Sequence, residues 1–329
     1  MGIDRALQAA VTGVDRCASR TRPGNAWDDP ELAASLRKVR KGRFTMALRL
    51  LAEARTDFER RALRAETLAA AAASHVEALA AQTDYDNPDA CLLLGAARIS
   101  NAWKIRGGSY ARYVGSDRFQ RFWAELELAR EPLQRAAVLF PEDPVPWNHL
   151  QWYGLGIQVG RQELDRMWAE LQQRDPTLFA GHQTRIQVIA GKWKGSPREV
   201  ADFAAEIIAQ GVTGNPLVAL AATAHFENVF TGSDEAGTDE QARQAFCVPE
   251  VAEQIHQADK LWADHPRPHP YDPEAHHLLG AAFYYIGDYA RARDHLAHTD
   301  RRIPRIHPWM ATSVFPGLTY LRVRKKVAL

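Results

Sequence analysis

One stretch near the carboxyl end decides the fold: AHHLLGAAFYYIGDYARARDHLAHTDRRIP, residues 275–304. Both halves of this stretch carry small and large apolar residues at helical spacing: Leu279, Gly280, Phe283, Ala292 and Leu296. Gly287 separates the halves and Pro304 follows the second one. A small residue on each helix lets the two axes approach closely while larger groups fill the space beside them. The stretch therefore predicts a hairpin of two packed helices.

This pattern resembles the tetratricopeptide repeat, at the residues just quoted. The departures are His276, where that family favours Trp, and Thr299, where it favours Ala. Parts of the same pattern recur upstream: Gly42, Phe44, Ala47, Leu51 and Ala54; Leu94 and Gly95; Leu133, Ala136 and Pro141; Trp168, Leu171 and Pro176. Recurrence at nearly the usual period of the repeat predicts an array of hairpins. Residues 147–160 and 190–204 are also similar to actinobacterial helical-repeat proteins of unassigned function.

The predicted fold class is all-α: a right-handed α-solenoid of antiparallel helical hairpins with extra N-terminal helices. Residues 1–84 are expected to form these helices, which include a long Ala-rich one and pack on the solenoid or cap it. The repeats are assigned to 85–304 and a C-terminal segment to 305–329, within one continuous domain. Segments 106–116 and 231–240 do not fit the repeat period, so loop insertions are expected there.

Composition limits the classes of function. The chain has 329 residues, of which 46% are hydrophobic and 25% charged, as in folded globular proteins. Lys and Arg number 41 against 40 Asp and Glu, so the balance of charge argues against a nucleic-acid partner. Three widely spaced cysteines favour a reducing compartment, and no apolar run resembles a signal peptide or a membrane span. These features predict a cytoplasmic protein with no membrane partner.

The sequence contains no convincing catalytic or cofactor motif. GLGIQVG at 154–160 continues a helix, whereas a dinucleotide fingerprint lies between a strand and a helix. GKWKGS at 191–196 lacks the Gly-Lys-Ser/Thr ending of a phosphate loop. The densest group of histidines is His265, His269, His276 and His277. Neighbouring histidines on a helix point about 100° apart, so a shared metal ion is disfavoured. No cofactor, no metal ligand and no catalytic residue are assigned.

Polar residues and tryptophans recur in the predicted first helices of the middle hairpins and in one loop. The tetratricopeptide resemblance implies that first helices line a concave surface where ligands dock. The candidate binding residues are Asn148, His149, Trp152, His182, Gln183, Arg185, Trp193, His225, Asn228 and His277. Their alternative role is in contacts between helices, with the histidines hydrogen-bonded in the core. Within the quoted stretch, His276 takes the place of a packing aromatic, and His277 is the better candidate to face the groove.

Two functions remain open. The first is a non-enzymatic binding or scaffold protein that holds a peptide or a partner protein on the concave face. The second is an enzyme or a small-molecule-binding protein with a site for a small polar ligand in the same groove. Fold alone does not decide between them.

Overall fold

Helices account for nearly all of the secondary structure, as predicted. We analysed a computed structural model, which describes residues 21–24, 26–107, 115–193, 195–229, 237–304 and 307–329. The expected loop insertions fall mostly outside these residues. Among the described helices, none is long and apolar enough to cross a lipid bilayer. The helical class is therefore confirmed.

The described residues fall into two compact units. The N-terminal unit comprises Asp28–Val188, and the C-terminal unit comprises Ile189–Leu329 together with the residues up to Trp27. This division does not coincide with the expected boundaries after residues 84 and 304, which stay predictions. Each unit is described by itself below.

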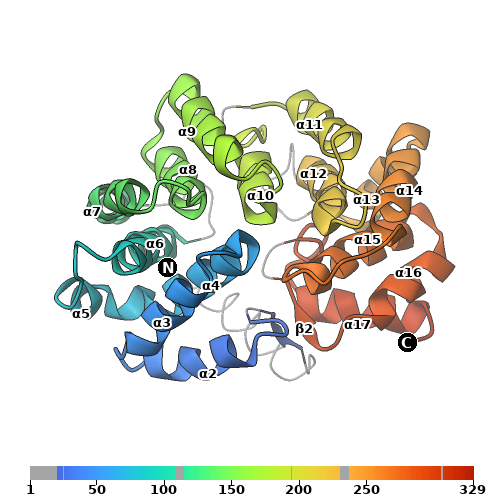
Figure 1. Ribbon diagram of the computed structural model, residues 1–329. Helices are drawn as coiled ribbons and strands as arrows, with labels where there is room; N and C mark the ends of the chain where they lie inside the picture. The colour runs from blue at the N-terminus through green and yellow to red at the C-terminus, as the bar shows by residue number, and fades with distance from the viewer. Residues whose placement is uncertain (1–20, 25, 108–114, 194, 230–236, 305–306) are drawn as a thin grey trace. The chain divides into compact units, whose positions relative to one another are not determined.

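The N-terminal unit is built only from helices in its described part (Figure 1). They are α2 (Pro30–Val39), α3 (Thr45–Glu53), α4 (Phe58–Ala72), η1 (Ala73–His75), α5 (Val76–Ala80), α6 (Pro88–Arg106), α7 (Ser116–Leu139), α8 (Val145–Ile157), α9 (Arg161–Arg174) and α10 (Phe179–Val188). The side chains of Asp29, Asp57 and Asn87 accept hydrogen bonds from backbone amides in the first turns of α2, α4 and α6. Such caps explain why Asp, Asn and Pro clusters punctuate the chain.

The Ala-rich segment lies inside this unit. Instead of one long helix, it forms α4, the single turn η1 and the short helix α5. Helix α4 packs against α6, α8 and α10, and Figure 1 shows the blue α4 beside the teal α6. Ala62, Ala65 and Ala69 are fully buried, and their small side chains allow this close approach.

The C-terminal unit contains the helices α11 (Pro197–Ala209), η3 (Pro216–Ala219), α12 (Leu220–Val229), α13 (Asp239–Phe246), α14 (Pro249–Ala263), α15 (Asp272–Ile286), α16 (Tyr289–Ala297) and α17 (Pro316–Lys326). Two short strands, β1 (Arg22–Pro23) and β2 (Arg302–Ile303), pair in parallel. The hairpin predicted from the quoted stretch is α15–α16, and Gly287 makes its turn with a φ of +97°. That left-handed conformation favours glycine.

One packing solution recurs in three helix pairs. A Cβ atom on Gly95 of α6 would lie 2.5 Å from Cγ of Leu133 on α7. A Cβ on Gly280 of α15 would lie 2.6 Å from Cδ2 of Leu296 on α16. Between α9 and α10, Gly181 leaves the same space for Leu171, at 2.7 Å. Real Cβ atoms do not approach so closely, so each glycine makes room for a leucine of the neighbouring helix.

A buried arginine ties α4 to the starts of two other helices. Arg61 is fully buried, and its Nε donates to Asp143 Oδ2 at 2.7 Å. Its Nη1 donates to Asp89 Oδ1 and to the carbonyl oxygen of Leu51, each at 2.7 Å. Asp89 lies in the first turn of α6, and Asp143 accepts the amide N–H of Val145 at the start of α8. The arrangement fixes α6 and α8 against α4 through charge-assisted hydrogen bonds.

Replacing Arg61 with lysine is expected to destabilise the protein severely. A single ammonium group cannot match the geometry of two carboxylates and a carbonyl, so a buried charge loses its partner. The free energy of unfolding should fall by about 3–5 kcal/mol in urea titrations. Arg60→Lys is the matched control, since the Arg60 side chain is 52% exposed and bonds Asp57, three residues earlier on the same turn. Equal unfolding midpoints for the two variants would contradict this role.

The glycine–leucine packing gives a second prediction. Gly95→Ser inserts atoms where Leu133 lies, and such overpacking should lower the free energy of unfolding by about 1–3 kcal/mol. Gly160→Ser is the control, because nothing lies within 4 Å of a Cβ at Gly160 and its φ of −62° suits any residue. Serine is also favoured at that helix N-cap. Thermal unfolding of both variants tests the prediction, which fails if Gly95→Ser is as stable as the control.

Candidate functional site

Helix α8 carries four polar side chains in five residues, and they are enclosed rather than solvated. We call Trp147, Asn148, His149 and Gln151 the α8 polar cluster. Asn148 and Gln151 are 0% exposed, and His149 is 4% exposed. Prolines in the first turn and the bond from Val145 to Asp143 start the helix just before these residues. The local sequence thus places polar groups on a helix that packs against α4, α6, α7, α9 and α10.

Several atoms of this cluster have no hydrogen-bond partner among the described residues. They are Trp147 Nε1, Asn148 Oδ1, His149 Nε2, Gln151 Oε1 and Gln151 Nε2. Buried polar groups in folded proteins are paired in the large majority of cases, and an unpaired one costs about 1–3 kcal/mol. Five such atoms within two turns of one helix are expected of a binding site more than of a core.

The surroundings of the cluster come from α4 and α6. Asn148 Nδ2 donates to Oε1 of Glu66 on α4 at 3.4 Å, which is long for a hydrogen bond. Trp152, one turn further along α8, packs edge-on against Trp103 of α6 with 5.5 Å between ring centroids. The site therefore combines uncharged hydrogen-bonding groups with an aromatic pair and one nearby carboxylate.

The cluster itself carries no charge near neutral pH. Burial lowers the pKa of His149 to about 4, so its imidazole stays neutral. An uncharged set of donors and acceptors suits a neutral, hydrogen-bonding ligand. It does not suit a phosphate or a carboxylate, which requires positive charge or a helix N-terminus.

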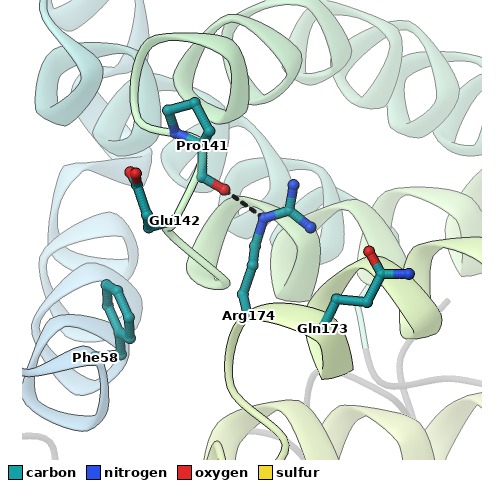
Figure 2. Close-up of a pocket in the computed structure, with 5 residues that line it drawn as sticks. All are labelled: Phe58, Pro141, Glu142, Gln173 and Arg174. Atoms are coloured by element: carbon teal, nitrogen blue, oxygen red, sulfur yellow. Dashed lines mark hydrogen bonds between the residues drawn. The ribbon is translucent and has the colours of Figure 1, made fainter.

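A surface hollow of about 380 Å³ adjoins the start of α8. Its lining comprises Phe58, Pro141, Glu142, Gln173 and Arg174, which Figure 2 shows converging from α4, the α7–α8 connection and α9. Arg174 Nε donates to the carbonyl oxygen of Pro141 at 2.6 Å, the dashed line in Figure 2. The guanidinium of Arg174 also lies over the ring of Trp147, 5.1 Å from its centroid. The hollow thus lies next to the first residue of the cluster.

Two of the predicted residues on α10, His182 and Arg185, contact Trp168 of α9. The ring of His182 packs edge-on against Trp168, with centroids 5.0 Å apart, and Arg185 lies over the same ring at 5.7 Å. Arg185 Nη2 also bonds Asp165 at 2.6 Å. Burial lowers the pKa of His182 to about 4. Gln183 is half-buried on the same helix. The structure therefore brings His182 and Arg185 together.

The other four predicted residues lie in the C-terminal unit, and two of them, His225 and Asn228, lie on α12. His225 Nε2 bonds Gln254 Oε1 at 2.9 Å, and Asn228 Nδ2 donates to the carbonyl oxygen of Pro197 at 3.1 Å. Trp193, in the segment before α11, is half-buried. These contacts hold α12 against α14 and the start of α11.

His277 is fully enclosed. Its Nε2 donates to the carbonyl oxygen of Arg302 at 2.8 Å, and its Nδ1 accepts from Trp309 Nε1 at 3.1 Å. Tyr320 and Trp27 pack against the same ring. Burial lowers the pKa of His277 to about 3. His277 thus joins α15 to the segment that follows the hairpin, a hydrogen-bonded core role that was the alternative for these histidines.

A buried ionic chain in the C-terminal unit lies outside the predicted set. Glu227, 1% exposed, accepts from Lys192 Nζ at 2.6 Å and from His307 Nε2 at 3.0 Å. Burial alone would raise the pKa of Glu227, but His307 and Lys192 hold it at about 2. The chain joins three segments that are distant in sequence, so no local pattern could have revealed it.

Gln151 and Glu66 are also absent from the predicted set. Gln151 follows Asn148 by three positions, which places the two side chains on adjoining parts of one helix face. That spacing was a usable signal. No sequence signal pointed to Glu66, because its contact with α8 depends on how α4 packs.

Comparison with known proteins gives no relative: no family model, no curated protein and no solved structure matches this chain. In the described ranges, no group of three or more His, Cys, Asp or Glu residues is arranged to hold a metal ion. The site must therefore be interpreted from its own chemistry.

Replacing Gln151 with methionine is expected to stabilise the protein. The substitution removes two buried amide atoms that lack partners and keeps a similar volume, so the free energy of unfolding should rise by about 1–3 kcal/mol. Gln210→Met, at an exposed position, is the matched control and should change little. A loss of stability in Gln151→Met would show that the amide is satisfied in solution and would remove the basis of the site.

Proposed function

We propose that this protein is a non-catalytic binding module, a tetratricopeptide-like right-handed solenoid whose α8 polar cluster holds an extended peptide segment of a partner protein. The observation that carries the proposal is the set of five buried, unpartnered polar atoms on α8. Selection for stability alone would remove such groups, so their presence points to a bound state in which they are paired.

The chemistry of the cluster matches a peptide backbone. Each peptide unit offers one N–H donor and one C=O acceptor. The carboxamide of Gln151 offers one acceptor and donor hydrogens, Asn148 Oδ1 offers an acceptor, and Trp147 Nε1 offers a donor. All of these groups are uncharged, so they can bind a backbone independently of the sequence of its side chains.

Two neighbouring features add apolar contact and a route of approach. The Trp103–Trp152 pair provides an aromatic surface for a side chain of the peptide. The hollow beside Trp147 lies at the surface, and the long bond between Asn148 and Glu66 is readily exchanged for a better one.

A small neutral ligand is the second candidate, as part of a small-molecule-binding protein or an enzyme. It is favoured by the complete burial of Asn148 and Gln151, because small-molecule sites enclose most of the ligand surface. In that case the same five atoms would bind one compact molecule.

A peptide array that tiles the proteins of the source organism tests the proposal, with fluorescence anisotropy on the peptides that bind. Asn148→Leu and Gln151→Met should each weaken binding by about tenfold, since one lost hydrogen bond is worth about 1 kcal/mol or more. Both variants should remain folded.

Thr223→Val provides the control for this experiment. Thr223 Oγ1 is also buried without a partner among the described residues, but it lies on α12 in the other unit. The control should leave peptide affinity unchanged. Equal affinity for all variants would contradict the proposed site, and a small molecule found by native mass spectrometry, lost in Gln151→Met, would support the second candidate instead.

A further inference from the structure

Three imidazoles and a carboxylate meet where α14, α15 and α16 pack together. His276 Nδ1 on α15 lies 3.0 Å from His295 Nδ1 on α16. His295 Nε2 lies 3.0 Å from Asp259 Oδ1 on α14. The ring of His298, at the end of α16, stacks on His276 with centroids 4.4 Å apart and planes 13° apart. We call His276, His295 and Asp259 the histidine latch.

The latch is packed on both sides. Trp262 of α14 lies 4.5 Å from the ring of His276 and stacks on His295 at 5.9 Å. Phe283 of α15 stacks on the ring of His295 at 5.7 Å. His295 is 8% exposed, and His276 is half-buried. The two imidazoles therefore cannot separate without moving α16 away from α15.

The contact between the two Nδ1 atoms limits the number of protons that the latch can hold. A hydrogen bond between two nitrogens needs one proton between them. His295 Nε2 faces the carboxylate of Asp259, so this nitrogen carries a hydrogen. In the neutral imidazole, Nδ1 of His295 therefore accepts a hydrogen bond from His276 Nδ1. In the charged imidazole, Nδ1 of His295 carries a hydrogen too and donates to His276 Nδ1. One extra proton is thus compatible with the contact. Two extra protons would place a hydrogen on each Nδ1, and the contact would break.

Among the charged groups around the latch, the neighbouring imidazoles oppose protonation of His276 and Asp259 favours it. Burial lowers the pKa of His276 to about 3, and charge on His295, His298 and His277 opposes its protonation further. Burial would raise the pKa of Asp259, but the bonds from His295 and Arg291 hold it below its ordinary value. The titratable and charged groups that surround the two imidazoles are Asp259 on α14, His277 on α15, Arg291 on α16 and His298 at the end of α16. Asp259 is the carboxylate among these groups, and it is already bonded to Arg291.

We propose that the histidine latch is an acid-sensitive device that holds α16 against α15 near neutral pH and releases it when His276 takes up the second extra proton of the imidazole pair. The sign of the pH effect follows from the difference in proton affinity between the open and closed states. The open state binds this proton with an ordinary histidine affinity and the closed state binds it weakly, so acid favours opening. The equilibrium between closed and open states should shift by about tenfold per pH unit below roughly pH 6.5. This regulation does not depend on the proposed peptide site, which lies in the other unit.

Native-state hydrogen exchange on the full chain tests the latch. The readout is protection of the amides in α16 relative to those in α11, which contains no histidine and belongs to the same unit. After correction for intrinsic exchange rates, relative protection of α16 in the natural protein should fall about 15-fold between pH 6.5 and pH 5.

The decisive variant is His276→Asn, whose amide can still donate to His295 Nδ1 but does not titrate. Relative protection of α16 in this variant should be the same at both pH values. His256→Asn is the matched control, because His256 packs on Phe283 from α14 and should leave the pH dependence intact. If His276→Asn fails to fold, His276→Gln also removes the titrating imidazole, keeps an amide donor and carries the same expectation. The proposal is overturned if α16 of the natural protein loses no relative protection at pH 5, or if His276→Asn loses as much.

Discussion

The N-terminal unit depends on one arginine in the middle of its core. Arg61 bonds Asp89 at the start of α6 and Asp143 just before α8, so a single side chain sets the positions of two helix starts relative to α4. Burying these charges is expensive, and only full pairing offsets that cost. Burial raises the pKa of the Asp143 carboxyl, while the charge of Arg61 and the N–H of Val145 oppose that shift. Because α8 starts at this bond, the candidate binding cluster depends on it too.

Arg61 and the α8 polar cluster differ in how their buried polar groups are hydrogen-bonded. Both are buried and polar, and both lie where α4 meets α8. Arg61 donates to two carboxylates and a carbonyl, whereas Gln151, only two turns beyond Asp143, has no partner in the described part of the chain. The guanidinium of Arg61 makes three hydrogen bonds through Nε and Nη1, and only its Nη2 lacks a partner among the described residues. The peptide that we propose for this site would supply partners for the carboxamide of Gln151.

The histidines show how the same residue type acquires different roles from its surroundings. His276 and His277 are adjacent, yet one contacts a second imidazole on α16 and the other is bonded to Arg302 and Trp309. The 100° between neighbouring helical side chains sends them to different interfaces. His149 differs again, because it is buried with no partner for its Nε2 among the residues described. Burial lowers the pKa of all three, and of these three His276 is the one that contacts the imidazoles of His295 and His298.

The helical class, the hairpin at α15–α16 and the use of small residues in helix packing could be predicted from the sequence, because they depend on periodicity and residue size within one or two neighbouring elements. Asn148 and His149 could also be selected, because polar residues on an apolar helix are visible locally. The packing of α4 against α8, the contact of Glu66 with Asn148 and the lack of a partner for Gln151 among the described residues became evident only in the folded chain. Likewise, the enclosure of His277 depends on Trp27 and Trp309, which are far from it in sequence. Such contacts depend on packing between distant segments, and no local pattern of residues encodes them.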